Sequence, residues 1–410
     1  MARAIELVPG HSVALLQGAQ ELFPALVQAM DAATRSIYFE TYICDFTDSG
    51  ARIGEALERA AQRGVRVQLL ADGFGTGELA PVWLERLSRS GVQYQVFAPL
   101  GFLGLLLPQR WRRLHRKLCV VDDALLFCGG INLLDDWYDP NHGRLQAPRL
   151  DFAVQVRGPI AQQASATMQM VWWRMQAASA ARSHHLDAAR QALKAAQRVK
   201  KQGTRRDPAQ GTALGGVRAA LLLRDNLRNR SGIERAYLRA IAQARVEVII
   251  ANAYFVPGRK LRRALVHAAQ RGVRVRLLLQ GRYEYFLQYH AARPVYGALL
   301  KAGIEIHEYA PSFLHAKVAV IDAEGTHPWA TVGSSNLDPL SLLLAREANV
   351  AVADGEFACT LRARLVDAME HAGEQIDSAA YAARPWRARV LDRLAFVLVR
   401  TALWLTGKVY

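Results

Sequence analysis

Short apolar runs alternate with stretches of helical periodicity along most of the chain. The runs are four to eight residues long and rich in Val, Ile and Leu, as expected for buried strands. A helix predicted at 49–62 is closed by Arg63-Gly64 and leads directly into such a run. This helix–glycine–strand order is typical of a crossover connection in an α/β sheet. The predicted strands are 36–43, 65–70, 92–97, 117–122, 124–128 and 151–156, then 246–251, 273–279, 304–309, 317–322, 329–332 and 347–352.

The pattern is an internal repeat. The octapeptide Ala-Ala-Gln-Arg-Gly-Val-Arg-Val stands at 60–67 and again at 268–275. Each half is therefore predicted to form one α/β unit, and the two units to pack about a pseudo-twofold axis. A predicted helix at 162–180 and a basic segment that ends at Asp207-Pro208 separate them. The basic residues, which would form a solvated helix and tether or contact anionic lipid, are Arg190, Lys194, Arg198, Lys200, Lys201, Arg205 and Arg206.

The composition indicates which class of partner to expect. The formal net charge is +16 and the sequence pI is about 10.0, so the partner is expected to be polyanionic, either nucleic acid or an anionic membrane surface. Hydrophobic residues make up 51% of the chain, yet there is no run of twenty apolar residues and no signal-peptide pattern at the N-terminus. Four cysteines without metal-ligand spacing (Cys44, Cys119, Cys128 and Cys359) predict buried thiols in a reducing compartment.

One polar motif also occurs twice. His115-x-Lys117 is followed by four residues and Asp122, and His315-x-Lys317 is followed in the same way by Asp322. The period-2 pattern places each His and Lys side by side on one strand face, where an unpaired buried charge would be costly. Each copy leads into a Gly-rich turn that ends in Asn, namely Gly129-Gly130-Ile131-Asn132 and Gly333-Ser334-Ser335-Asn336. We expect such turns to direct backbone N–H groups outward and to suit anion binding.

This doubled motif resembles the phospholipase D superfamily and, most closely, its bacterial cardiolipin synthases of the short, peripheral branch without N-terminal transmembrane helices. The resemblance extends from about Pro9 to the C-terminus. It implies an α/β fold of two tandem phospholipase D-type α/β/α sandwich domains related by pseudo-twofold symmetry, with the active site at their interface. The expected division is an N-terminal domain at 1–180, a basic linker at 181–212, a C-terminal domain at 213–380 and an amphipathic membrane-associating tail at 381–410.

The resemblance also implies roles for the motif residues. His115 would be the nucleophile and His315 the general acid and base, whereas the Lys and Asn side chains would hold the phosphate oxygens. Asp151 and Glu347, which open the strand after each Gly-rich turn, would orient the histidines, but the sequence does not say which serves which. The site expected is catalytic His115, Lys117, Asp122, His315, Lys317 and Asp322, with substrate-binding Gly129, Asn132, Ser334 and Asn336; the two aspartates would brace the site. No cofactor or metal is expected.

Two stretches are more apolar than ordinary loops and tails. Residues 100–108 precede the first histidine and contain five leucines, followed by Arg110, Arg112 and Arg113. This stretch is either a buried hairpin or an exposed loop suited to acyl chains. The stretch 389–406 predicts a helix with Arg389, Arg393 and Arg400 on one side and apolar residues (Leu391, Leu394, Leu398, Trp404 and Leu405) over the rest. It would lie in a membrane interface or dock on the protein.

The function expected is phosphatidyl transfer between two phosphatidylglycerol molecules, giving cardiolipin and glycerol through a phosphatidyl-histidine. Phosphatidylethanolamine is an alternative donor. A phosphodiesterase acting on nucleic acid is the runner-up, supported by charge, but the apolar stretches favour lipid and argue against nucleic acid as the partner. A non-catalytic membrane scaffold is disfavoured because both motifs are complete. The expected location is the cytoplasmic side of the inner membrane, bound peripherally to its anionic surface.

Overall fold

The structure is a computed structural model that describes residues 6–99, 104, 112–139, 142–204, 215–225, 229, 231–282, 286–338 and 345–405. The side chains of residues 200–204, 286–289, 291, 399, 400 and 402–405 are not among those described. The chain forms two compact units. One, here the first-motif unit, consists of Leu7–Asp135 and Ala153–Leu221; the other, the second-motif unit, consists of Met1–Glu6, Asp136–Phe152 and Leu222–Tyr410.

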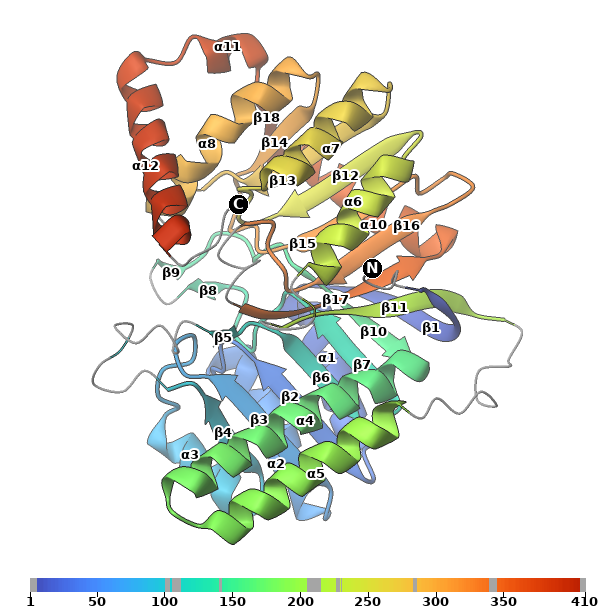
Figure 1. Cartoon of the computed structure of the whole chain (residues 1–410), viewed down its shortest axis with the longest axis vertical. Helices are drawn as coiled ribbons and strands as arrows, with labels where there is room; N and C mark the ends of the chain where they lie inside the picture. The colour runs from blue at the N-terminus through green and yellow to red at the C-terminus, as the bar shows by residue number, and fades with distance from the viewer. Residues whose placement is uncertain are drawn as a thin grey trace. The chain divides into compact units, whose positions relative to one another are not determined.

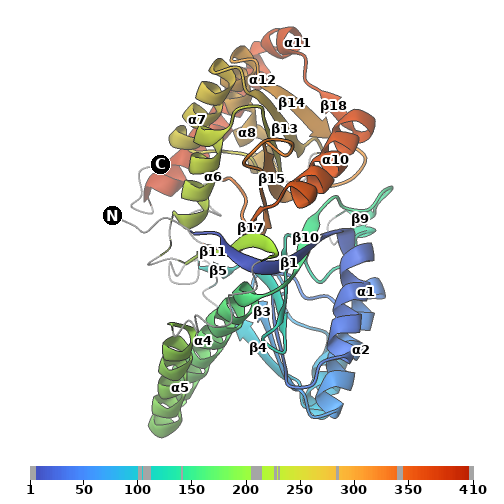
Figure 2. The same ribbon diagram turned by 90° about the vertical axis from the view of Figure 1, so that its right-hand side faces the viewer.

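The first-motif unit is a mixed sheet between two layers of helices (Figure 2). Its strands run in the order β4-β3-β2-β6-β7-β10-β1: β4 (Gln93–Phe97), β3 (Arg66–Asp72), β2 (Ser36–Thr41), β6 (Lys117–Val121), β7 (Leu125–Gly129), β10 (Phe152–Arg157) and β1 (Val8–Gln17). On one face α1 (Gly18–Asp31), α2 (Ala51–Gln62) and α3 (Pro81–Ser90) enclose the main core, in which Leu22, Phe39, Ile53 and Phe127 are buried. On the other face α4 (Pro159–Arg182) packs against β2, β6 and β7, and α5 (Leu186–Thr204) packs on α4.

The second-motif unit repeats this plan (Figure 1). Its sheet order is β18-β14-β13-β12-β15-β16-β17, formed by β18 (Gly373–Gln375), β14 (Glu305–Tyr309), β13 (Arg274–Gln280), β12 (Glu247–Asn252), β15 (Lys317–Ile321), β16 (Trp329–Gly333) and β17 (Ala345–Ala353). Helices α6 (Gly232–Gln243), α7 (Arg259–Gln270) and α8 (Phe286–Lys301) lie on one face, and α10 (Gly355–Ala372) lies on the other (Figure 2). The short α11 (Ser378–Ala382) leads into α12 (Trp386–Leu405), which packs along α8.

Strand register confirms the internal repeat residue by residue. Ile37 of β2 lies opposite Val121 of β6, and Val248 of β12 lies opposite Ile321 of β15. The predicted strands are all present, with ends shifted by a residue or two. The sequence missed β1 and β11 (Val217–Arg224), which pair antiparallel with Val8 opposite Ala219. Pro9 and Gly10 interrupt the apolar pattern of β1, and no strand was predicted there.

Residues 136–152 differ from the sequence-based division of the chain. They were assigned to the first domain, 1–180, but they cluster with the second half. The predicted linker contains α5, whose Ala189, Ala192 and Ala196 are buried against α4 while Arg190, Lys194 and Arg198 are exposed. The stretches 100–103, 105–111 and 205–214, which hold most of the predicted apolar loop and the end of the linker, lie outside the described residues. The division into domains otherwise stays a prediction.

The cysteines agree with the prediction except at one position. Cys44, Cys119 and Cys128 are buried, and burial raises the pKa of the Cys128 thiol to about 12. Cys359 is exposed, so the prediction of a buried thiol is wrong there. It lies on the outer side of α10, whose buried side is formed by Phe357, Ala358, Leu361 and Leu365.

Candidate active site

The first histidine lies just before β6, against an aromatic ring that the sequence reading missed. The rings of His115 and Tyr42 meet edge to face with centroids 4.8 Å apart. The preceding residue, Leu114, donates its backbone N–H to the fully buried Asp72 at 2.7 Å. Asp72 is the last residue of β3, so the end of a neighbouring strand fixes the approach to His115.

The second histidine has a carboxylate partner. His315 Nδ1 lies 2.7 Å from Asp151 Oδ2, and the Asp151 side chain is 3% exposed. Backbone hydrogen bonds align the two segments, because Leu150 donates to Phe313 O (3.0 Å) and His315 donates to Leu150 O (2.9 Å). A carboxylate on Nδ1 fixes the tautomer and orientation in which an imidazole acts through Nε2. Asp151 is therefore the partner of His315, a pairing that the sequence had left open.

Both motif lysines are buried and folded back on their own strands. Lys117 Nζ donates to His115 O at 3.0 Å and lies 5.1 Å from the centroid of the Tyr42 ring. Lys317 Nζ donates to His315 O in the same way, and its side chain is fully buried. Each ammonium thus lies beside the backbone of the neighbouring histidine. A buried cation of this kind can stabilise negative charge on a phosphate strongly, since little water screens it.

The motif aspartates lie at the other end of the same strands. Seven residue steps of extended chain, at about 3.3 Å each, put Asp122 roughly 20–25 Å along the strand from His115. Asp122 accepts hydrogen bonds from the N–H groups of Thr34, Arg35 and Ser36 (2.9, 2.7 and 2.8 Å). Burial opposes its ionisation, but these hydrogen bonds outweigh burial and lower the pKa of the Asp122 carboxyl.

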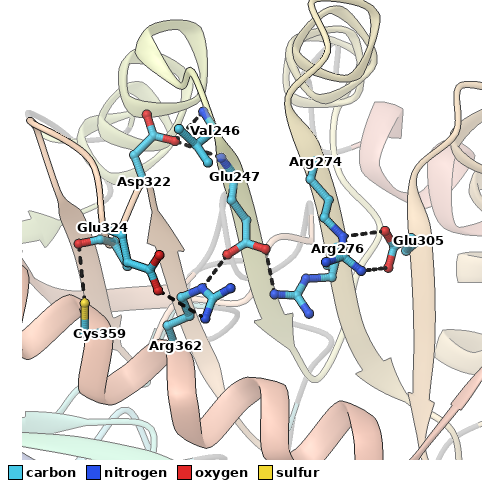
Figure 3. Close-up of polar contacts among 10 residues, drawn as sticks. Val246, Glu247, Arg274, Arg276, Glu305, Asp322, Glu324, Cys359 and Arg362 are labelled. Carbon is cyan, nitrogen blue, oxygen red and sulfur yellow. Dashed lines mark hydrogen bonds and ion pairs between the residues drawn. The ribbon is translucent and has the colours of Figure 1, made fainter.

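Asp322 does the same in the second half. It accepts from the N–H groups of Arg245, Val246 and Glu247, each at 2.8 Å, and so fixes the start of β12 (Figure 3). The neighbouring Glu247 carboxylate joins Arg276 at 2.6 Å and Arg362 at 2.7 Å, which links β12 to β13 and α10. Both aspartates therefore fix the start of the strand that pairs with the motif strand, which is β2 for Asp122 and β12 for Asp322.

The Gly-rich turns differ from the expected anion cradle. In the second turn, Ser334 N–H donates to Ala348 O (3.0 Å) and Ser335 N–H to Asn349 Oδ1 (3.3 Å). The expectation of outward N–H groups is wrong for these two residues, because the turn packs closely on β17. A Cβ at Gly333 would lie 2.4 Å from Ala348 O, so the glycine serves this close approach.

The polar side chains of the turns are partly engaged as well. Ser334 Oγ donates to Glu347 Oε2 at 2.5 Å. Asn132 Oδ1 accepts from Ile43 N at 3.2 Å, and Gly129 pairs with Lys117 across β6 and β7. Asn336 is 2% exposed, and its Oδ1 has no hydrogen-bond partner among the described residues. Asn336 is thus the turn side chain with spare capacity for a ligand.

A buried ion pair beside the first motif also escaped the sequence reading. Arg116, between the motif His and Lys, joins Glu40 of β2 at 2.7 Å, and the side chains are 3% and 2% exposed. The corresponding positions in the second half are Ala316 and Ala251, as the register of β6 on β2 and of β15 on β12 shows. One repeat has opposite charges at these two positions and the other has alanine at both. This difference was the sequence signal that could have identified the contact.

Comparison with known proteins agrees with this architecture. A family profile described as "Cardiolipin synthase, PLD-like domain" matches residues 26–145 and 237–382. The chain belongs to this family of phospholipase D-like proteins. It is 36% identical over 397 residues to cardiolipin synthase B of Escherichia coli K12, covering 95% of this chain and 88% of the relative. The cardiolipin synthase of Halalkalibacterium halodurans is 29% identical, over 92% of this chain and 70% of the relative. The resemblance inferred from the doubled motif is confirmed.

Solved structures show the same fold in more distant proteins. A phosphatidylserine synthase from Haemophilus influenzae Rd KW20 aligns with a TM-score of 0.66 at 12% identity, covering 98% of this chain and 96% of that one. A polyphosphate kinase from Porphyromonas gingivalis aligns with a TM-score of 0.55 at 15% identity, covering 95% of this chain and 53% of that one. The predicted α/β class with tandem phospholipase D-type domains is confirmed.

Proposed function

We propose that this family member is a phosphatidyltransferase that joins two phosphatidylglycerol molecules into cardiolipin and releases glycerol. The observation that carries the proposal is the doubled His-x-Lys motif, in which His315 is held by a buried carboxylate at 2.7 Å. The relatives named cardiolipin synthase support the same reaction. The family requires a histidine that attacks phosphorus and a second that handles the proton, and this chain supplies one in each half.

Phosphatidyl transfer proceeds in two displacements. In the first, His115 attacks the phosphorus of one phosphatidylglycerol, the bond to the headgroup glycerol breaks, and His315 gives its proton to the departing oxygen. In the second, His315 takes the proton of a glycerol hydroxyl on the second lipid, that oxygen attacks the phosphorus, and the bond to His115 breaks. Asp151 keeps the His315 ring in the tautomer and orientation that both steps need.

The other motif residues are assigned to stabilising negative charge on the phosphate or to bracing the fold. Lys117 and Lys317, both buried, would offset the negative charge that shifts onto the non-bridging oxygens in each transition state. Asn336 and Asn132 would add amide contacts to the same oxygens. We assign Asp122 and Asp322 to bracing, because their hydrogen bonds are made to the backbone roughly 20–25 Å along the strand from the histidines.

Lipid mass spectrometry tests this function. The purified protein is incubated with phosphatidylglycerol vesicles, alone and with phosphatidylethanolamine. Cardiolipin with stoichiometric glycerol supports the proposal, whereas cardiolipin only when phosphatidylethanolamine is added assigns that lipid as donor. A parallel incubation with single-stranded and plasmid DNA tests the alternative that the net charge of +16 suggests. Nucleic acid cleavage without lipid turnover would refute the lipid assignment.

The location that we propose is the anionic cytoplasmic face of the inner membrane, with α12 as one contact. On α12, Trp386, Leu394, Val397 and Leu398 are 64%, 63%, 56% and 60% exposed, although Ala395 on the opposite side is buried. Arg387, Arg389 and Arg393 are exposed around this apolar face and would meet lipid phosphates. The side chains of Arg400, Trp404 and Leu405 lie outside those described. Within the described part of the chain, no helix is both long and apolar enough to span a bilayer.

A further inference from the structure

A second carboxylate–imidazole pair lies on the segment that supplies Asp151. His142 Nδ1 is 2.9 Å from Asp139 Oδ1, which also accepts the backbone N–H of His142 at 3.0 Å. The other oxygen, Asp139 Oδ2, is held by Arg149 at 2.8 Å. Asp139 is 6% exposed, whereas the His142 side chain remains 36% exposed. The imidazole is thus fixed at its base and open to solvent at its edge.

The pair is placed beside the second motif. The ring of His142 lies against that of Phe313, with centroids 5.0 Å apart, and Phe313 stands two residues before His315. Hydrogen bonds of Leu150 to Phe313 and His315 fasten the same segment to the motif strand. The short strands β8 (Tyr138–Asp139) and β9 (Gly143–Arg144) give this segment its own pairing. This segment therefore supplies two carboxylates that each hold a histidine ring, Asp151 for His315 and Asp139 for His142.

We propose that His142 contacts the acceptor alcohol, that is, the glycerol headgroup of the lipid that receives the phosphatidyl group. This inference rests on the proposed function and deepens it. Because Asp139 engages Nδ1, the nitrogen at the exposed edge is Nε2, which can exchange a hydrogen bond with a hydroxyl. The acceptor hydroxyl must approach His315 to lose its proton, and His142 packs against Phe313, two residues before His315.

The chemical consequence is a choice between two acceptors. In the second displacement either a glycerol hydroxyl or water can give its proton to His315 and attack the phosphorus as the bond to His115 breaks. The first acceptor gives cardiolipin and the second gives phosphatidic acid. A glycerol headgroup has a second hydroxyl that does not react, and His142 holds this group. Water has no such group, so the contact favours transfer over hydrolysis.

The experiment measures the ratio of cardiolipin to phosphatidic acid made from phosphatidylglycerol vesicles, together with glycerol release. In His142→Ala the ratio should fall about fivefold or more, the scale of one net hydrogen bond, while glycerol release falls by a smaller factor. His142→Gln, which keeps a polar atom near the position of Nε2, should recover part of the ratio. Asp139→Asn, which loosens the imidazole, should lower the ratio in the same direction.

The matched control is His371→Ala. His371 makes the same kind of pair with Asp367, at 3.0 Å, but it is 74% exposed on α10, and its substitution should leave the ratio at the wild-type value. An unchanged ratio in His142→Ala, or a loss of both products in equal proportion, overturns the inference while leaving the proposed function standing. Wild-type protein that releases no glycerol from phosphatidylglycerol overturns the proposed function, and this inference with it.

Discussion

The buried ion pair of Glu40 and Arg116 gives a prediction with an internal reference. In Arg116→Met the carboxylate of Glu40, 2% exposed, would lose the guanidinium at 2.7 Å while remaining buried. Removing one partner of such a pair costs about 3–5 kcal/mol of the free energy of unfolding. The double variant Glu40→Leu/Arg116→Met replaces both charges by apolar side chains of similar volume, and we expect it to lie within about 1–2 kcal/mol of wild type. The second half already carries two alanines at these positions, which shows that the strand pair tolerates uncharged residues.

Urea unfolding followed by circular dichroism measures these differences, with a double-variant cycle giving the coupling between the two positions. The control is Arg59→Met. Arg59 pairs with Asp31 at 2.9 Å, but both side chains are at least 40% exposed, so its loss should cost no more than about 1 kcal/mol. The reasoning fails if Arg116→Met costs as little as this control, or if the double variant is as unstable as the single one.

Four further predictions concern activity, the membrane and pH. His115→Ala and His315→Ala should each abolish phosphatidyl transfer in the vesicle assay, whereas His327→Ala, exposed on the β15–β16 turn, should not; substantial activity in either motif variant would contradict the two-histidine mechanism. Activity should survive EDTA, because the two histidines perform the proposed nucleophilic attack and proton transfers. A loss of activity with EDTA that one particular divalent ion restores would argue against this. Deleting the residues after Pro385 should shift the protein toward the soluble fraction and reduce activity on vesicles more than on detergent-dispersed lipid; full sedimentation with membranes would assign α12 to packing alone. Since the pKa of Asp122 is lowered in the folded protein, its stabilising effect should be full above its unfolded pKa and lost as the pH falls through the folded value; an Asp122→Asn variant with an unchanged acid-unfolding profile would contradict this.

The sequence predicted the repeated parts well because they are local. The helix–glycine–strand unit ending in β3 and β13 depends on apolar periodicity and a glycine C-cap, both visible within a dozen residues. The strands β1 and β11 were missed for the opposite reason. Each gains its stability by pairing with the other, and Val8 and Ala219 are far apart in the chain. Local pattern carries no information about such a partner.

The candidate site shows the same contrast between features set by local sequence and features set by long-range contacts. The motif identified His115 and His315, since identity and spacing suffice there. It could not match Asp151 to His315, because 164 residues separate them and only the backbone pairing of Leu150 with Leu314 brings them together. The outward N–H groups of the Gly-Ser-Ser-Asn turn were predicted from its residue types alone. In the structure the turn packs closely on β17, and this packing sets the direction of its N–H groups. His142 gave no signal in the sequence, because its meaning depends on Phe313 beside it.

The long-range pairing of Asp151 with His315 also sets an order for synthesis in the cell. Ribosomes extend chains at about 5–20 residues per second, so the 164 residues between the two take roughly 10–30 s to appear. Throughout that interval the segment 136–152 has emerged, but the strand on which it docks does not yet exist. Residues 7–135 can begin to fold early, whereas the carboxylate that serves the second histidine must wait for its partner. A nascent chain of this protein therefore cannot complete its proton-handling pair until most of the polypeptide has been translated.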